Sequence, residues 1–161
     1  MLNIFKKNKK CEIFSPIDGK SIQLNEVPDK VFAQKLMGDG VGFILDGPFV
    51  CAPCDGELTM LAPTSHAFGI KAVNGAEILV HVGLDTVSLK GEGLKTLVKQ
   101  GEKLKKGSKV IEVDIELLKE KRIDLTTPMV VTNGGDYKMK SLLVDQLVKK
   151  GESLVLTLEK K

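Results

Sequence analysis

This chain of 161 residues has few aromatic side chains, a small net charge and no long apolar run. It has no tryptophan, one tyrosine and six phenylalanines, and its formal net charge is only +3. A nucleic-acid-binding surface usually combines strong positive charge with aromatic side chains that stack on bases, so the composition argues against a nucleic-acid partner. No apolar run approaches the roughly 18 residues that a membrane-spanning helix needs.

Cysteine is scarce as well, with Cys11, Cys51 and Cys54 as its three positions. An odd number of cysteines and an N-terminus without a secretory signal lead us to expect a cytoplasmic protein. Cys51 and Cys54 form a C-x-x-C pattern, but Asp55-Gly56 directly after it predicts a turn into a strand. A redox motif would open a helix instead, and a zinc site would need a second cysteine pair. We interpret the two thiols as structural.

The remaining composition is that of an ordinary globular domain, with 42% hydrophobic and 28% charged residues. We expect residues 11–161 to form a single domain with one core. Residues 1–10 read MLNIFKKNKK, in which apolar residues precede four lysines. We expect a flexible, amphipathic and basic arm there; the alternative is a weak anchor on a membrane surface.

From Cys11 onward, short alternating segments are interrupted by glycine, proline, asparagine and aspartate. This pattern predicts an all-β fold, an antiparallel β-sandwich or distorted barrel with short helices at its edges. The helices are expected at residues 29–37, 94–99 and 115–121, and residues 136–147 are ambiguous.

Two internal echoes indicate that the β architecture is pseudo-repeated. Residues 15–20 recur approximately as 52–57, and residues 98–104 as 148–154. Such turns also resemble those of lipoyl and biotinyl carrier domains. The nearest candidate for a carrier lysine is Lys138-Met139-Lys140, which lacks a matching half, so we do not favour that class.

The two histidines of the chain, His66 and His81, flank an Asn74-Gly75 pair set between alternating apolar residues. Asn-Gly in this setting predicts a β-hairpin with a two-residue loop. Val73 would then face Ala76, and the histidines would lie diagonally on one face of the sheet. A four-residue loop would place them directly opposite each other, whereas an odd-length loop would separate them.

A pair of imidazoles is compatible with several chemistries. One histidine could be a nucleophile and the other an electrostatic helper, the pair could be half of a metal site, or both could be polar residues on a solvated sheet face. His81 and Asp85 also fit an H-x-x-x-D pattern of zinc peptidases. That site needs further histidines, and the chain has none.

The segments around the histidines resemble a known family. TSHAF at 64–68, EILVHVGLDTV at 77–87 and LKGEG at 89–93 are similar to the glucose-family enzyme IIA of the bacterial phosphoenolpyruvate-dependent sugar phosphotransferase system. VPDKVF at 27–32, GDG at 38–40, APCDG at 52–56 and TPMVVTN at 127–133 resemble it too. The similarity extends from about residue 15 to residue 158, nearly the whole chain, and it implies the same β fold.

The resemblance implies a phosphotransferase that works as a relay. It would accept a phosphoryl group from the phosphocarrier protein HPr and pass it to a cysteine on the IIB domain of a sugar permease, which supports sugar uptake. His81 would be phosphorylated on Nε2, with its other ring nitrogen held by the Gly83 carbonyl. His66 would donate a hydrogen bond to the phosphoryl oxygens, and Thr64 would support His66. A purely regulatory binding protein, switched by its phosphorylation state, is a further alternative.

The resemblance also implies a partner surface with an apolar centre and acidic positions, formed by Asp29, Phe32, Met37, Phe68, Leu79, Asp85 and Val87. Leu79 stands where some relatives carry a larger aromatic residue. The relay requires no cofactor and no metal, although His66 and His81 could serve as incidental zinc ligands. We expect the protein to be a monomer.

Overall fold

The computed structural model describes residues 9–161, and the expected arm at residues 1–10 therefore lies almost wholly outside the described part. Within that part the chain forms fourteen strands and two short α-helices, α2 (Lys30–Ala33) and α3 (Ile115–Glu120). The strands are β1 (Lys10–Phe14), β2 (Gly19–Gln23), β3 (Asp39–Leu45), β4 (Phe49–Cys51), β5 (Gly56–Leu61), β6 (Ala67–Ala72), β7 (Glu77–His81), β8 (Leu94–Thr96), β9 (Lys103–Leu104), β10 (Lys109–Val113), β11 (Thr126–Val131), β12 (Tyr137–Lys140), β13 (Leu147–Val148) and β14 (Leu154–Lys160). Three 3-10 turns complete the description: η1 (Leu24–Glu26), η2 (Thr86–Leu89) and η3 (Gly134–Asp136).

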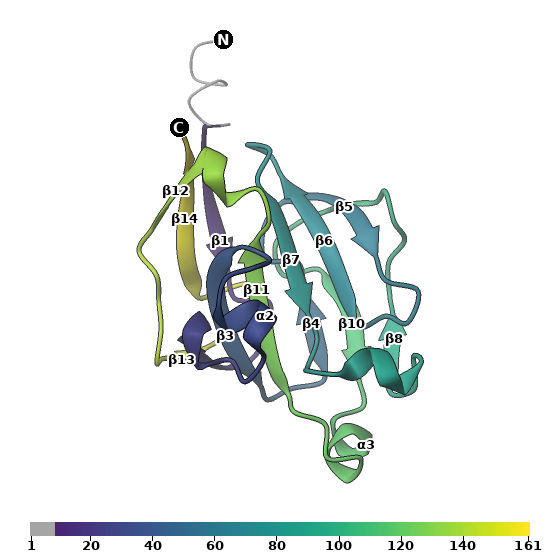
Figure 1. Ribbon diagram of the computed structural model, residues 1–161. Helices are drawn as coiled ribbons and strands as arrows, with labels where there is room; N and C mark the ends of the chain where they lie inside the picture. The colour runs from purple at the N-terminus through teal and green to yellow at the C-terminus, as the bar shows by residue number, and fades with distance from the viewer. Residues whose placement is uncertain (1–8) are drawn as a thin grey trace.

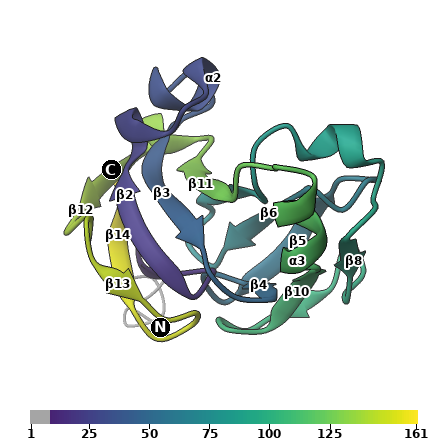
Figure 2. The same cartoon turned by 90° about the horizontal axis from the view of Figure 1, so that it is seen from below.

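The strands build three sheets, and every pairing between them is antiparallel. A large sheet has the strand order β13-β2-β3-β11-β7-β6-β5-β9, and two small sheets have the orders β1-β14-β12 and β4-β10-β8. The small sheets lie toward opposite ends of the large one (Figures 1 and 2). The expected fold class, an antiparallel β-sandwich or distorted barrel with short helices, is confirmed.

A single large hydrophobic core joins the three sheets, with members from Cys11 in β1 to Leu158 in β14. Alternation along β3 shows how it forms, since Val41, Phe43 and Leu45 are all buried while Ile44 is 39% exposed. Cys11, Cys51 and Cys54 are buried free thiols. Burial raises the pKa of Cys51 to about 11 and that of Cys54 to about 12, which supports a structural role.

A second, smaller cluster lies beneath α2 and holds the buried side chains Ile22, Leu24, Val27, Phe32, Leu84 and Val130. Gly42 of β3 makes room for it, because a Cβ there would lie 2.8 Å from Val27 Cγ2 and 2.9 Å from Ile22 Cγ1. Asp29 begins α2 by accepting a hydrogen bond from the Val31 amide at 2.9 Å. The helix ends before Lys35, whose φ of 60° is left-handed.

Two of the expected helices differ from the structure. The helix predicted over residues 29–37 is reduced to α2, while the one predicted over 115–121 is confirmed as α3. Residues 94–99 do not form a helix: Leu94 to Thr96 are strand β8, which pairs with β10 through Leu94–Val113 and Thr96–Ile111. The ambiguous residues 136–147 contribute β12 instead, because Tyr137 to Lys140 pair with β14. No helix within residues 9–161 is long and apolar enough to cross a membrane.

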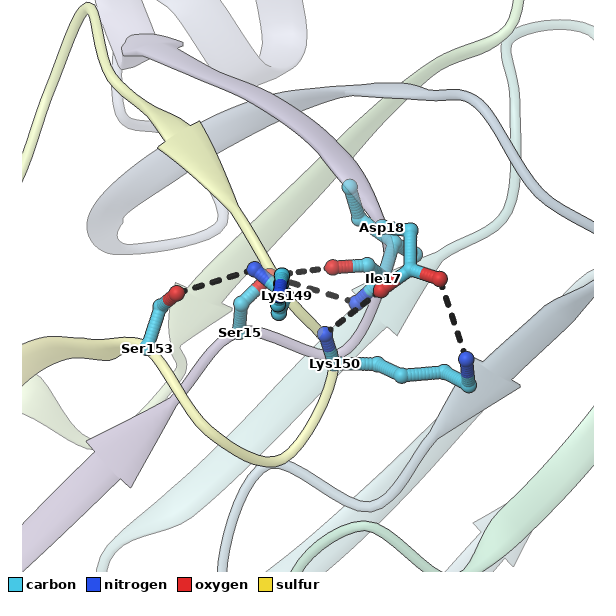
Figure 3. Close-up of polar contacts among 6 residues, drawn as sticks. All are labelled: Ser15, Ile17, Asp18, Lys149, Lys150 and Ser153. Carbon is cyan, nitrogen blue, oxygen red and sulfur yellow. Dashed lines mark hydrogen bonds and ion pairs between the residues drawn. The ribbon is translucent and has the colours of Figure 1, made fainter.

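The first sequence echo is present as two loops that face each other. The Phe14 amide donates to the Pro53 carbonyl and the Cys51 amide donates to the Pro16 carbonyl, both at 2.7 Å. Each loop also binds a Lys-Lys-Gly turn through an aspartate: Asp18 accepts from the Lys150 amide, as drawn in Figure 3, and Asp55 accepts from the Lys106 amide.

The second echo, of residues 98–104 with 148–154, is present as a similar local turn, because the Glu102 amide donates to the Lys99 carbonyl as the Glu152 amide donates to the Lys149 carbonyl, both at 3.1 Å. By contacts with the facing loop, however, the turn equivalent to 148–151 is 104–107, because the Gly107 amide donates to the Ala52 carbonyl as the Gly151 amide donates to the Ser15 carbonyl, both at 2.8 Å. Lys150 also forms an ion pair with Asp18, with Lys150 Nζ 3.0 Å from Asp18 Oδ2 (Figure 3). Within the described residues, the corresponding Lys106 and Asp55 share only the hydrogen bond from the Lys106 amide. Strand β2 also pairs with β13, and β5 pairs with β9, in each case the strand that directly precedes the Lys-Lys-Gly turn.

Candidate functional site

The β6–β7 hairpin carries one of the two histidines, and its loop differs from the predicted one. The observed pairs are Lys71–Glu77, Ile70–Ile78 and Ala67–His81, which leaves an odd-length loop centred on Asn74. Gly75 has a φ of +90° and is the left-handed residue that closes this three-residue loop. Asn74 is turned inward: its amide nitrogen donates to the Leu158 carbonyl at 3.2 Å, which ties the loop to β14.

The two histidines meet although the register alone would separate them. Strand β6 begins only at Ala67, so His66 lies just outside it, and Ser65 before it has φ 59°. The backbone carbonyl of His66 still accepts a hydrogen bond from the Val82 amide at 2.7 Å. The imidazole centroids lie 5.2 Å apart with an interplanar angle of 69°. A left-handed turn that no sequence period reveals therefore brings the rings together.

Ser65 is held in this turn by the neighbouring small sheet. Its hydroxyl lies 2.6 Å from the Thr96 hydroxyl of β8, and its amide donates to the Ala62 carbonyl at 2.8 Å. A left-handed backbone is unfavourable for a residue with a side chain, so these contacts offset a local strain.

Both imidazoles have Nδ1 engaged, which leaves both Nε2 atoms without a hydrogen bond inside the described chain. His81 Nδ1 lies 2.7 Å from the Gly83 carbonyl. A carbonyl only accepts, so Nδ1 carries the proton and Nε2 of neutral His81 has the free lone pair. His66 Nδ1 contacts the Thr64 hydroxyl. If that hydroxyl donates, His66 carries its proton on Nε2 and can donate it outward.

Burial lowers the pKa of His66, and the neighbouring His81 lowers it further. Because the ordinary histidine pKa is near 6.5, His66 is mainly neutral at pH 7. The site thus presents one ring nitrogen with a free lone pair beside a second, neutral imidazole. That arrangement suits capture of an electrophilic group followed by hydrogen bonding to its oxygens.

Gly83 is the residue that permits the His81 contact. Its φ is +69°, and a Cβ at this position would lie 2.8 Å from Thr86 Cγ2 and 3.0 Å from the Asp124 carbonyl oxygen. A side chain would therefore displace the turn that directs the Gly83 carbonyl at the imidazole.

Most of the expected partner-surface residues have exposed or half-buried side chains. Met37 is 41% and Val87 is 56% exposed, and Asp85 is exposed as well. Leu79 is half-buried against the cluster beneath α2, and the Phe32 ring centroid lies 5.4 Å from that of His81. Asp29 is half-buried and directs its carboxylate at the Val31 amide.

Phe68 is a correction. It is 0% exposed and belongs to the large core, because it faces Val80 within the hairpin on the side away from solvent. Sequence reasoning also missed two exposed apolar residues near α2, Val31 at 43% and Leu36 at 69%. The sequence did carry a signal, since Val31 directly precedes the expected contact Phe32 and Leu36 directly precedes the expected contact Met37.

The described residues contain no group of three or more histidine, cysteine, aspartate or glutamate side chains placed to hold a metal ion. His66 and His81 on their own provide at most two nitrogen ligands.

Comparison with known proteins places the chain in a family. Residues 11–137 match the family model described as phosphoenolpyruvate-dependent sugar phosphotransferase system, EIIA 1. The chain is 41% identical over 147 residues to the PTS system glucose-specific EIIA component of Halalkalibacterium halodurans, which covers 91% of this chain and 85% of that protein. The solved structure of glucose permease IIA from Mycoplasma capricolum matches with a TM-score of 0.86 at 36% identity, over 93% of this chain and 97% of the other.

A further relative is much longer than this chain. The PTS system glucoside-specific EIICBA component of Staphylococcus carnosus is 42% identical over 144 residues, which is 89% of this chain but only 21% of that protein. The match with the family model, the relative covered over most of its length and the solved fold agree with one another. The chain belongs to the EIIA family of the phosphoenolpyruvate-dependent sugar phosphotransferase system, whose members relay a phosphoryl group from HPr to a IIB domain.

Proposed function

We propose that His81 is the residue that carries the phosphoryl group in this chain. The observation that supports it best is the hydrogen bond from His81 Nδ1 to the Gly83 carbonyl, because it leaves the Nε2 lone pair free at the surface. The lone pair forms a bond to the phosphorus of phospho-HPr as the phosphorus–nitrogen bond to HPr breaks. In the second step a IIB cysteine thiolate attacks the phosphorus, and the electron pair returns to His81 Nε2.

His66 and Thr64 assist this transfer. With the Thr64 hydroxyl donating to Nδ1, His66 donates its Nε2 proton to a phosphoryl oxygen. The lowered pKa of His66 favours its neutral form, in which the hydroxyl can donate to Nδ1. Phosphoryl transfer depends mostly on positioning and on stabilising negative charge, and this pair supplies both without a metal.

The partner surface surrounds His81 and combines apolar side chains with two carboxylates. We assign Phe32, Leu79, Met37 and Val87 to its apolar part and Asp29 and Asp85 to its acidic part. An apolar cover excludes water from the reacting phosphorus during transfer. The acidic residues are suited to basic side chains of HPr and of the IIB domain, which would steer the encounter.

Intact-mass measurement tests the relay. The protein is incubated with phosphoenolpyruvate, enzyme I and HPr, and we expect it to gain a single phosphoryl group that is labile in acid and stable in base. Omission of HPr is the control and should abolish the gain. A phosphoryl group that survives acid would exclude histidine as its site.

The acceptor is a permease for glucose or glucosides. The two relatives at 42% and 41% identity carry the names glucoside-specific and glucose-specific, and the first is an EIICBA component in which A is joined to B. Phosphorylated protein offered to a purified glucose-type or glucoside-type IIB domain should lose its phosphoryl group to that domain. A IIB domain whose cysteine is replaced by serine is the matched control.

The protein acts as a monomer in the cytoplasm, and its basic N-terminal residues are dispensable for acceptance from HPr. Deleting residues 2–8 keeps all of β1 and should leave the acceptance rate in solution unchanged. Association with anionic vesicles, if it occurs, should weaken on deletion and fade with added salt. A large loss of acceptance from HPr would show that this segment helps to form the site.

A further inference from the structure

The peptide between Val82 and Gly83 is held at both of its polar atoms by threonine hydroxyls. Thr86 Oγ1 donates to the Val82 carbonyl at 2.6 Å, and the Gly83 amide donates to Thr127 Oγ1 at 3.2 Å. Both threonines are 0% exposed, so no solvent competes for these bonds. Thr127 Oγ1 in turn donates to the Leu125 carbonyl at 3.1 Å, which commits its one proton and directs a lone pair at Gly83.

The next peptide, between Gly83 and Leu84, is held on its amide side. The Leu84 amide donates to the Asp124 carbonyl at 2.9 Å. The Gly83 carbonyl belongs to the same peptide, and it accepts from His81 Nδ1 at 2.7 Å. Hydrogen bonds in such a chain polarise one another, so the Leu84 bond makes the Gly83 carbonyl a better acceptor.

The two peptides that flank Gly83 are thus fixed by η2 and by the residues at the start of β11. Of their four polar atoms, three are bound to Thr86, Thr127 and Asp124, and the fourth is the carbonyl that faces His81. Gly83 needs this support because its φ of +69° is one of several conformations open to glycine. Among the three anchors, Thr127 is the one whose side chain acts directly on Gly83.

We propose that Thr127 is a positioning residue for phosphoryl transfer. Its hydroxyl fixes the Gly83 turn, and the turn holds His81 as the Nδ1–H tautomer with its Nε2 lone pair free. The inference rests on the proposed role of His81 as nucleophile. No proton moves at Nδ1 during the transfer: the Nε2–phosphorus bond forms, the donor's nitrogen–phosphorus bond breaks, and Nδ1 keeps its hydrogen bond to Gly83.

Thr127→Val tests the proposal because valine keeps the shape of threonine but has no acceptor for the Gly83 amide. Thr127→Ser restores the hydroxyl and is the rescue variant. Thr157→Val is the matched control, since Thr157 is a buried strand threonine in β14, in a different sheet. Two quantities are measured on each protein: the His81 tautomer by ¹⁵N NMR of the imidazole nitrogens, and the single-turnover rate of acceptance from phospho-HPr.

We expect Thr127→Val to shift His81 toward the Nε2–H tautomer and to slow acceptance by about 10–100-fold, the loss typical when a second layer of hydrogen bonds is removed around a ligating histidine. Thr127→Ser and Thr157→Val should keep the Nδ1–H tautomer and stay within about threefold of the unmodified rate, a margin well below that loss. An unchanged tautomer in a folded Thr127→Val protein would overturn the proposal, and so would equal rate losses in the valine and serine variants.

The tautomer measurement also separates this inference from the proposed function, because it needs no phosphotransfer partner. A protein that accepts no phosphoryl group on His81 could still show the tautomer shift, and only the relay assignment would then fail. If Thr127→Val does not fold, Thr127→Ala replaces it, since alanine also lacks the acceptor and is smaller. A His81 tautomer unaltered by alanine would be equally decisive against Thr127.

Discussion

The rings of Phe32 and His81 lie 5.4 Å apart at an interplanar angle of 59°, so a phenylalanine from α2 covers one side of the proposed nucleophile. Phe32 is 6% exposed and belongs to the small cluster beneath α2. A helix of only four residues is thus linked directly to the His81 ring. This relationship connects local stability of the surface around α2 with chemistry at Nε2.

Replacing Phe32 by alanine should therefore affect two properties. We expect the free energy of unfolding to fall by about 3 kcal/mol, the lower end of the range for a buried phenylalanine, because the cluster holds only six buried residues. The phosphorylated protein should also hydrolyse faster, since water gains access to the imidazole. Chemical denaturation and the decay of the phosphorylated protein by intact mass measure the two effects. Val73→Ala, at a 57% exposed loop position, is the control and should change neither.

The pH dependence of stability should carry a contribution from His66. Burial lowers its pKa in the folded protein, whereas the unfolded value is near 6.5. As the pH falls through about 6.5, the unfolded chain takes up a proton that the folded protein resists, so folding stability is lost on acidification. Between about pH 7.5 and 5.5, the range that spans this pKa, the Tm of the unmodified protein should fall more steeply than that of His66→Gln. Equal slopes would show that His66 does not titrate differently in the two states.

Gly151 and Gly107 form a matched pair at the crossing of the two Lys-Lys-Gly turns. Both have positive φ, +72° and +84°, so alanine should cost about 1–2 kcal/mol at either position. A Cβ at Gly151 would lie 2.8 Å from the Gly107 Cα, but a Cβ at Gly107 would lie 3.6 Å from the Gly151 Cα. Gly151→Ala should therefore be clearly the more destabilising variant in urea denaturation. Acceptance from HPr by the folded fraction should be normal in both, because the crossing lies outside the histidine site.

The sequence predicted the elements whose signals are local. Asn74-Gly75 between alternating apolar residues correctly located a hairpin, and the echo of residues 15–20 at 52–57 correctly indicated two equivalent loops. The loop length was wrong because Asn74 is held by the Leu158 carbonyl, a contact 84 residues away. The left-handed Ser65 was invisible for a similar reason, since its support comes from Thr96 in another sheet. The structure thus departs from the prediction twice, with a loop of odd length and with a strand β6 that begins only after His66. The two departures compensate each other, so the histidines still come together.

The assignment of roles at the candidate site depended on family resemblance more than on periodicity. When the strand register is unknown, alternation along β6 does not show which of its faces is exposed, so it could not decide between Phe68 and Gly69 as the surface residue. In the structure, Phe68 belongs to the core. Thr127, which anchors the Gly83 turn, had no sequence signal, because it lies 44 residues after its partner. Contacts of this range follow from the sheet order, in which β11 is next to β7.

The two histidines should behave asymmetrically when each is replaced by glutamine. His81→Gln removes the only ring nitrogen placed with its lone pair free, so it should accept no phosphoryl group at all. His66→Gln keeps that nitrogen, and its amide can still donate one hydrogen bond to a phosphoryl oxygen. Acceptance from HPr should persist, while donation to the IIB cysteine should slow by about 10²–10³, the usual effect of losing one donor that stabilises transition-state charge. Single-turnover rates of both half-reactions check this.

The nucleophile is identified by which variant loses acceptance from HPr and which variant is slowed only in donation to the IIB cysteine. A general disturbance of the site would slow both half-reactions of His66→Gln alike, and circular dichroism of both variants controls for misfolding. If His66→Gln blocked acceptance while His81→Gln did not, the roles would be reversed, and the Thr64 contact rather than the Gly83 contact would hold the reacting ring. If neither variant lost acceptance, the phosphoryl group would reside elsewhere. The free Nε2 of His81 would then not be the nucleophile, and the chain has no third histidine to take its place.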